Sequence, residues 1–221
     1  MRKKVLIADD HQLIVDGLVR ILEPDYDILK PALDGRALLR SVAELRPDVV
    51  VADISMPLLN GLDAAAELTE SYPDVKVIIV TMHADVSFAA RAFDAGAAGY
   101  LLKQSASSEL KTAIETVLRG ETYIPPNMAD KLLRTYRGTA KVKEPERTEL
   151  TRRQREVLQL LAEGKSAAEA AEVLHLSPRT VEFHKYRMME LLGIKTHALL
   201  VRHAVDIGLV QADSAEASST D

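Results

Sequence analysis

The first half of the chain alternates short, mainly apolar runs with longer amphipathic segments. The apolar runs occupy residues 5–8, 49–52, 75–80 and 99–102, with a weaker one at 26–33. Runs of this length are typical of strands that are buried on both faces of a parallel sheet. Segments with the length and periodicity of helices follow them, at residues 11–22, 36–45, 62–71, 86–95 and 107–118. The pattern therefore predicts five strand–helix units in succession.

Strands that alternate with helices need right-handed crossover connections, which place helices on both faces of the sheet. We expect an α/β fold: a five-stranded, doubly wound parallel sheet of the flavodoxin-like kind, with strand order 2-1-3-4-5. In such sheets, ligands bind outside the carboxyl ends of the strands. The functional site is therefore expected among the residues that directly follow the strands.

Polar side chains occur together at these positions. The first predicted strand runs into Asp9 and Asp10, the third into Asp53, the fourth into Thr81 and the fifth into Lys103. Three carboxylates at one edge repel each other and favour a hard divalent cation, for which Mg²⁺ is the usual choice. The hydroxyl and the ammonium suit an incoming phosphoryl group. Asp53 is the candidate nucleophile.

From residue 151 onward the pattern becomes wholly helical. Four helix starts carry capping residues: Thr151 with Gln154, Ser166 with Glu169, Ser177 before Pro178, and Thr196. The second and third of these helices are joined by only three residues, 175–177. So short a connection is typical of a helix-turn-helix whose later helix enters the major groove of DNA. We therefore expect an all-α, four-helix domain after the sheet domain.

The later helix has an apolar face and an outward face that can bind DNA. Two aromatic residues, Phe183 and Tyr186, are predicted to face outward in a chain with only 4% aromatic residues, which indicates contacts with thymine methyl groups. The candidate DNA-binding residues are Arg179, Thr180, Glu182, Phe183, Lys185, Tyr186 and Arg187, with His184 as an additional candidate. Among them, Glu182 can accept from cytosine N4, and Thr180, Lys185 and Arg187 can hold phosphates. His184 lies beside the inward stripe, where a packed or backbone-bonded role competes with base contact.

Composition narrows the function further. No apolar run approaches the ~20 residues of a membrane span, and the apolar stretch after the basic N-terminus is too short for a secretion signal, so we expect a cytoplasmic protein without a membrane partner. The absence of Cys excludes disulfides, thiol catalysis and cysteine-ligated zinc. The net charge is −5, and the C-terminal part is only mildly basic. A single domain should therefore bind DNA weakly, and a homodimer is expected.

The strand-end residues, taken in order, resemble the receiver domain of response regulators over residues 4–119. The motif consists of Asp9-Asp10, Asp53 with Met56-Pro57 and Gly61, Thr81, and Tyr100 three residues before Lys103. The resemblance implies that a sensor histidine kinase phosphorylates Asp53, that Thr81 and Tyr100 are switch residues, and that Mg²⁺ is held by Asp9, Asp10, Asp53 and the backbone carbonyl of Ser55. It also implies that Ser55 and His83 affect the lifetime of the acyl phosphate. The sequence departs from many receivers at Gln104, where they have proline.

The block 149–210 is similar to the LuxR-type DNA-binding domain, through residues 150–158 and 176–184. Together with the receiver before it, the chain resembles the NarL/FixJ subfamily. The resemblance implies a dimer contact on the final helix, near Leu200, Val201 and Val205. The sequence departs from LuxR-type domains at Leu191, where such domains often have a basic residue. Without the resemblance, the helical hairpin would suit a protein partner as well as DNA.

We therefore expect a DNA-binding response regulator and not an enzyme, in which Mg²⁺-dependent phosphorylation of Asp53 controls dimerisation and transcription. The expected parts are a receiver (1–121), a linker with a short helix capped by Asn127 and running to Tyr136 (122–147), a helix-turn-helix domain (148–210) and a disordered tail (211–221). The alternatives are a phosphorylation-independent DNA-binding protein with a vestigial receiver, and an RNA-binding output domain. A phosphatase of the haloacid dehalogenase kind fits less well, since its nucleophile lies in an Asp-x-Asp motif on the first strand and it carries a cap domain.

Overall fold

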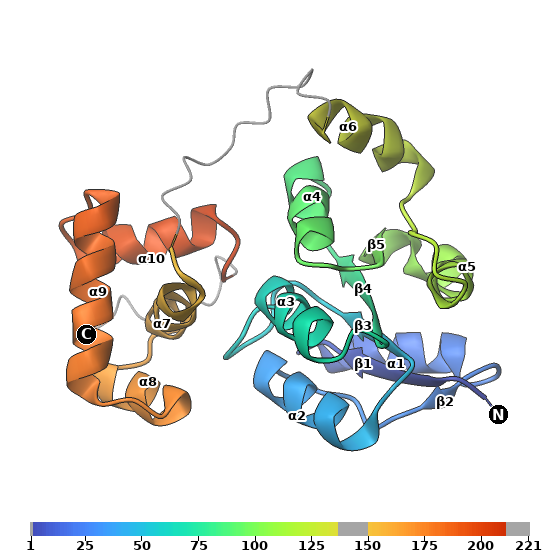
Figure 1. Cartoon of the computed structure of the whole chain (residues 1–221), viewed down its shortest axis with the longest axis horizontal. Helices are drawn as coiled ribbons and strands as arrows, with labels where there is room; N and C mark the ends of the chain where they lie inside the picture. Colours follow the sequence, from blue (N-terminus) through green and yellow to red (C-terminus); the bar gives the residue numbers. More distant parts are fainter. Residues whose placement is uncertain (1, 137–149, 211–221) are drawn as a thin grey trace. The chain divides into compact units, whose positions relative to one another are not determined.

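The computed structural model describes residues 2–136 and 150–210 and divides the chain into two compact units (Figure 1). The first unit is an α/β domain and the second is entirely helical, as predicted. The predicted tail at 211–221 and most of the predicted linker, residues 137–149, lie outside the described residues.

The first unit is built on a five-stranded parallel sheet with the order β2-β1-β3-β4-β5, which confirms the predicted topology. The strands are β1 (Lys4–Ala8), β2 (Asp27–Ile28), β3 (Val49–Ala52), β4 (Lys76–Thr81) and β5 (Gly99–Leu102). The predicted second strand is shorter than expected. After Ile28 the chain returns to the sheet only at Ala32, which pairs with Ala8. Pro31 intervenes, and proline has no amide proton to donate to a strand neighbour.

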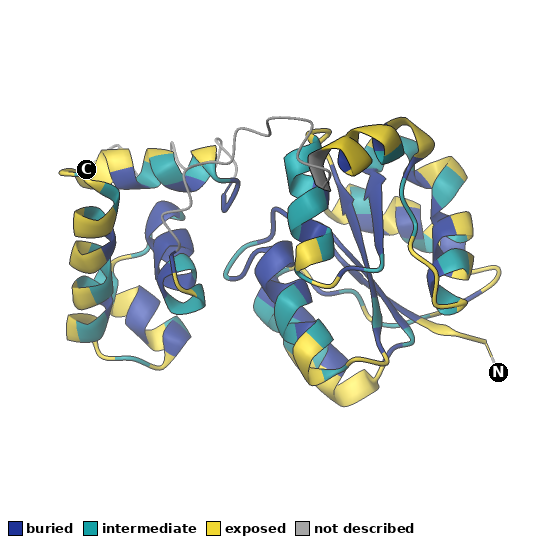
Figure 2. Ribbon diagram, turned by 45° about the horizontal axis from the view of Figure 1, so that its top comes forward, coloured by how far each residue is buried: buried dark blue, intermediate teal, exposed yellow. Residues whose placement is uncertain are grey.

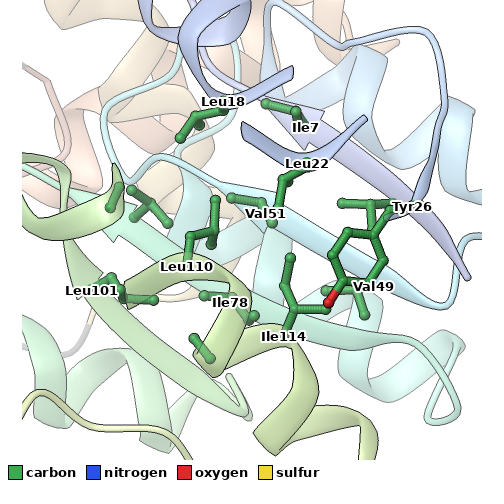
Figure 3. Close-up of a cluster of buried hydrophobic side chains, with 14 of the residues drawn as sticks. Ile7, Leu18, Leu22, Tyr26, Val49, Val51, Ile78, Leu101, Leu110 and Ile114 are labelled. Carbon is green, nitrogen blue, oxygen red and sulfur yellow. The ribbon is translucent and has the colours of Figure 1, made fainter. Parts of the chain in front are cut away.

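Helices cover both faces of this sheet, so that the central strands are buried between them (Figure 2). The helices are α1 (Gln12–Leu22), α2 (Gly35–Leu45), α3 (Gly61–Ser71), α4 (Val86–Asp94) and α5 (Ala106–Leu118), with a short 3₁₀ turn, η1 (Lys103–Ser105), before α5. Each begins within one or two residues of its predicted start. The core on one face is formed where Leu18 and Leu22 of α1 and Leu110 of α5 pack on Val51 and Ile78 of the central strands (Figure 3).

The segment that follows α5 runs along the edge of the sheet, beside β5. The amide of Tyr100 in β5 donates to the carbonyl of Tyr123 (3.0 Å), so that the segment after α5 pairs with the last strand. A further helix, α6 (Pro126–Tyr136), then packs on α4, and its Met128 and Leu132 are buried. The helix predicted in the linker ends at Tyr136 as expected, but Asn127 lies inside its first turn and does not cap it. Pro126 takes the first position, because its fixed φ and missing amide proton suit a helix start.

The described part of the second unit contains four helices, α7 (Arg152–Ala162), α8 (Ala167–Leu174), α9 (Pro178–Leu192) and α10 (His197–Asp206). All four predicted caps are confirmed, including the two capping boxes that begin α7 and α8. The side chain of Arg153 holds α7 to the end of α8, since it donates to the carbonyl of Leu174 (2.6 Å) and pairs with Glu156 (2.7 Å). Within residues 2–136 and 150–210, no helix has the length and apolar character needed to cross a bilayer.

Candidate phosphoacceptor site and DNA-binding surface

The residues that follow the strands converge on one site, as predicted. Asp9 and Asp53 are buried at the ends of β1 and β3, with 2% and 3% of their surface exposed, whereas Asp10 is exposed. The ammonium nitrogen of Lys103 lies 2.7 Å from Asp9 Oδ2 and 2.8 Å from Asp53 Oδ2. The sheet topology brings these three groups together, because parallel strands end at the same edge.

Lys103 remains a cation although its side chain is only 7% exposed. Burial by itself lowers the pKa of an ammonium group, but the carboxylates of Asp53 and Asp9 outweigh it and raise the pKa of Lys103 above its usual value. The other oxygen of Asp53, Oδ1, accepts from the amide of Ile54 (2.7 Å). Both oxygens of the candidate nucleophile are therefore oriented by neighbouring donors.

Thr81 and Ser55 complete this edge of the sheet. Thr81 ends β4, beside β3, and is 1% exposed, and its hydroxyl accepts a long hydrogen bond from the amide of His83 (3.4 Å). The hydroxyl of Ser55 lies 3.3 Å from Nε2 of His83. Burial, the largest influence, lowers the pKa of His83. Near neutral pH its imidazole is therefore uncharged.

The switch candidate Tyr100 is fully buried, and its hydroxyl donates to the carbonyl oxygen of His83 (2.7 Å). Burial, followed by the nearby charges of Asp53 and Asp85, raises the pKa of Tyr100 strongly, so that the phenol stays protonated. The ring of His83 stacks on Phe88 in the first turn of α4, with centroids 4.2 Å apart. Sequence reasoning missed Phe88, since a single aromatic residue on an amphipathic helix gives no signal of this contact.

Gly61 has a steric role beside Asp53. A side chain at residue 61 would collide with the backbone carbonyl of Asp53, because α3 begins directly against the loop that follows β3. The amide of Gly61 also donates to the carbonyl of Ile54 (2.7 Å). Glycine at this position therefore allows the loop around Asp53 to close.

The donor set fits a divalent cation. Asp9, Asp10 and Asp53 each offer a carboxylate oxygen within 4.8 Å of the others, and carboxylate oxygens suit Mg²⁺. His11 belongs to the same group, and sequence reasoning missed it. Its Nδ1 lies 2.8 Å from Asp10 Oδ1 and 3.3 Å from Asp9 Oδ1. The available signal was its place directly after the aspartate pair at the end of a strand.

The outward face of α9 carries the predicted DNA-binding side chains. Phe183 and Tyr186 are 64% and 63% exposed, and Arg179 is exposed as well. Lys185 pairs with Glu182 (3.3 Å), and Arg187 pairs with Glu190 (2.7 Å). If Lys185 and Arg187 bind the DNA backbone, each must first give up its ion pair within the helix in order to contact a phosphate.

The remaining candidates of the second unit are more buried. Thr180 and His184 are half-buried. The hydroxyl of Thr180 bonds that of Ser177 (2.8 Å), and His184 packs edge-on against Phe183. Leu200, predicted to lie near a dimer contact, is fully buried in the domain core, where α10 packs on α7, so its side chain is not on the surface of the unit. Val201 and Val205 are half-buried.

A doubly wound unit with an acidic site at the strand ends, joined to a helical unit with a helix-turn-helix, defines the class of two-component response regulators. Residues 5–115 match the model of the response regulator receiver domain, and residues 148–204 match that of the bacterial regulatory proteins of the luxR family. The chain belongs to the NarL/FixJ subfamily of response regulators, a family of DNA-binding transcription regulators.

Known proteins resemble the chain over most of its length. It is 34% identical to the transcriptional regulatory protein DegU of Brevibacillus brevis, across 94% of this chain and 95% of that protein. It is 36% identical to the oxygen regulatory protein NreC of Staphylococcus carnosus, across 91% and 96%. Among solved structures, the RcsB response regulator of Salmonella typhimurium is 25% identical, with a TM-score of 0.63 over 93% of this chain and 98% of that one. An RcsB–DNA complex is 25% identical and has a TM-score of 0.56 over the whole of both chains, and RcsB dimers have been solved on DNA.

Proposed function

We propose that a sensor histidine kinase phosphorylates this regulator on Asp53, and that the phosphoryl group controls dimerisation and DNA binding. The observation that carries the proposal is the bridge of Lys103 between Asp9 and Asp53. A buried ammonium held between two carboxylates leaves one net negative charge, which a divalent cation would balance, and the cation and the ammonium would together offset the negative charge of an incoming phosphoryl group.

In the proposed reaction, a carboxylate oxygen of Asp53 attacks the phosphorus of a phosphohistidine. The phosphorus–nitrogen bond breaks as the phosphorus–oxygen bond forms, and the histidine nitrogen takes up a proton. Asp9, Asp10, Asp53 and the Ser55 carbonyl would hold Mg²⁺, which would supply charge neutralisation for the phosphoryl oxygens. Lys103 neutralises a further oxygen from its position beside Asp53.

The conformational response begins at Thr81. Within residues 2–136 and 150–210, its hydroxyl accepts one long hydrogen bond, from the His83 amide, so it can rotate to donate to a phosphoryl oxygen. That movement changes the environment of His83, which accepts from Tyr100 and stacks on Phe88 of α4. Phosphorylation thereby shifts the population of receiver conformations through differential contacts at the phosphoryl group.

The proposed DNA complex places α9 in the major groove, with Phe183 and Tyr186 against bases and Arg179, Lys185 and Arg187 on phosphates. The family implies a homodimer through α10. Exposed Leu199 (48%) and half-buried Val201 and Val205 are the surface residues we assign to that contact. A dimer doubles the number of phosphate contacts, which a mildly basic domain needs for tight binding.

The test compares wild type with Asp53→Asn. Acetyl phosphate with Mg²⁺ should label wild type and raise its affinity for duplex DNA, whereas Asp53→Asn should neither be labelled nor respond. Asp74→Asn, a change of an exposed carboxyl at the opposite edge of the sheet, is the matched control and should behave as wild type. Labelling of Asp53→Asn would remove the nucleophile assignment. Equal DNA affinity with and without the phosphodonor would favour the alternative, a constitutive DNA-binding regulator with a vestigial receiver.

A further inference from the structure

We propose that α6 is docked on α4 while Asp53 is unphosphorylated and is released from α4 when Asp53 carries a phosphoryl group. The inference rests on the proposed function, since phosphorylation is what releases the helix. Helix α6 is the last described helix of the first unit, and the chain continues from it to α7 of the second unit. Release of α6 therefore carries the state of Asp53 into the connection that leads to the DNA-binding helices.

The sheet itself holds α4 weakly. Among the described helices that cover the sheet, α4 alone buries no side chain larger than alanine, since its buried residues are Ala89 and Ala92. Helix α5, by contrast, buries Leu110, Ile114 and Val117. Stabilisation by burial grows with the apolar area removed from water, so two alanine side chains contribute little. Helix α4 can therefore shift at a lower cost than its neighbours.

Helix α6 covers α4 (Figure 1). Helix α4 contacts α3, β5 and α6, and its contact with α6 is the most extensive. Met128 and Leu132 lie one turn apart on α6, and each is only 4% exposed, whereas Leu133 is 51% exposed. Because α4 is the main packing partner of α6, loss of this contact would expose Met128 and Leu132.

A charge on α6 also acts on the start of α4. The side chain of Asp85 caps α4 by accepting from the amide of Ser87 (2.7 Å). Hydrogen bonding from Ser87, and to a smaller extent the positive charge of Lys131 on α6, lowers the pKa of Asp85. The contact between the two helices therefore includes an electrostatic attraction at the capped end of α4.

The length of α6 makes its docking reversible. The helix has 11 residues, and isolated helices shorter than about 12–15 residues are only marginally stable in water. Its stability therefore depends on the contact with α4. A change in α4 that weakens this contact should both release α6 and lower its helix content.

The loop between β4 and α4 connects the phosphoacceptor site to this contact. Under the proposed function, Thr81 turns towards the phosphoryl group and changes the environment of His83. The ring of His83 stacks on Phe88 in the first turn of α4, with centroids 4.2 Å apart, and Asp85 caps the same turn. A displacement of His83 therefore acts on the end of α4 whose cap is influenced by Lys131 of α6.

The segment that leads into α6 is bonded to β5 at the switch residue Tyr100. The amide of Tyr100 donates to the carbonyl of Tyr123 (3.0 Å), and the amide of Tyr123 donates to the carbonyl of Ala98 (3.0 Å). The hydroxyl of the same Tyr100 donates to the carbonyl of His83 (2.7 Å). Tyr100 thus connects the loop before α4 with the segment before α6, so the two can change together.

The experiment uses a single thiol as a reporter, because the chain has no cysteine of its own. In full-length Leu132→Cys, the rate of thiol reaction with an aromatic disulfide reagent is measured with and without acetyl phosphate and Mg²⁺. The matched control is Leu133→Cys, the same change at the next residue, whose side chain is exposed. Met128→Cys is a second reporter on the buried side of α6. Leu38→Cys, fully buried on α2, controls for general unfolding.

We expect the thiols of Leu132→Cys and Met128→Cys to react about tenfold faster after phosphorylation, a coupling of the size usual between linked sites. The rate in Leu133→Cys should stay within about twofold, and the thiol of Leu38→Cys should remain unreactive. No acceleration is expected when Asp53→Asn is combined with Leu132→Cys.

Unchanged rates at residues 128 and 132 in protein that the donor labels on Asp53 overturn this inference and leave the proposed function intact. Acceleration that persists in the Asp53→Asn background also overturns it, because the phosphoryl group would not be its cause. Failure of the donor to label Asp53 in the otherwise wild-type chain removes the proposed function, and this inference with it.

Discussion

At the scale of single residues, Lys103 determines the electrostatic balance of the receiver site. Its buried ammonium contacts one oxygen of Asp9 and one of Asp53, and both carboxylates are almost wholly removed from water. Burying charges is costly unless they are paired, so these three groups depend on one another. The raised pKa of Lys103 means that its stabilising effect is fully present below the usual lysine pKa and is lost as pH rises through the raised value.

Replacement of Lys103 by methionine tests this balance. Lys103→Met should lower the free energy of unfolding at neutral pH by about 3–5 kcal/mol, since two buried carboxylates lose their cation, and Mg²⁺ should restore part of the loss. Denaturant unfolding with and without Mg²⁺ is the measurement. The control is Lys111→Met, which removes an exposed ion pair with Asp25 and should cost less than about 1 kcal/mol. Equal effects of the two variants would contradict the argument.

His203 on α10 should make the stability of the protein depend on pH. Burial, opposed by the charge of Asp206, lowers the pKa of His203 in the folded protein. The unfolded chain therefore binds the proton more readily, and stability should fall as pH falls through the usual histidine value of about 6.5. Unfolding of the full chain at pH 7.5 and 5.5 should show a smaller decline in His203→Gln than in wild type. Parallel pH profiles for the two proteins would refute this assignment.

At the scale of elements, α9 has clear start and stop signals, and its outward face does not contribute to the core of its own domain. The helix begins at the Ser177 cap with Pro178 and ends at Gly193, whose φ of 66° favours glycine. Its buried side is formed by Val181 and Met188. Large aromatic side chains on the opposite side add nothing to the domain core, so their role is expected in binding.

Truncation of these aromatic side chains should separate binding from folding. Phe183→Ala and Tyr186→Ala should each lower affinity for a specific DNA site by about tenfold, which corresponds to about 1.4 kcal/mol. The free energy of unfolding should stay within about 0.5 kcal/mol of wild type, because both side chains are exposed. Leu13→Ala, which truncates an apolar side chain that is 84% exposed on α1, should leave DNA affinity unchanged. A fluorescence titration with duplex DNA measures the affinities.

At the scale of the whole molecule, DNA binding must overcome an unfavourable overall charge. The chain carries a net charge of −5, so attraction to DNA depends on cations gathered on one surface. Two cations of α9 are paired with acids of the same helix, which further reduces the field of a single copy. Under the proposed function, dimerisation and phosphorylation would therefore raise the affinity for DNA substantially.

The salt dependence of DNA binding reports the number of copies bound. In Arg179→Ala, the slope of log affinity against log salt should become shallower by about 0.9 for a monomer and by about 1.8 for a dimer, since one phosphate contact is lost from each copy. We expect the dimer value for the phosphorylated protein. Arg20→Ala, a change of an exposed arginine on α1, should leave the slope unaltered. An unchanged slope in Arg179→Ala would show that this residue does not contact phosphate.

The sequence by itself determined the order of strands and helices, the starts of the helices in the second unit and the meeting of Asp9, Asp53 and Lys103 at one edge. These features follow from local rules: apolar periodicity, capping side chains such as Ser166 with Glu169, and the fixed handedness of parallel crossovers. Such rules act between near neighbours or through chirality. They can therefore be applied without coordinates.

Only the tertiary structure decided which atoms of those residues face each other. It placed His11 against the two aspartates, stacked His83 on Phe88, and turned Leu200 into the core, where α10 packs on α7. A helical period leaves several residues of an apolar stripe equivalent, and the packing partner selects which of them is buried. The side-chain contacts of the site depend likewise on loops whose path is set by the elements around them, and no local pattern in the sequence encodes that path.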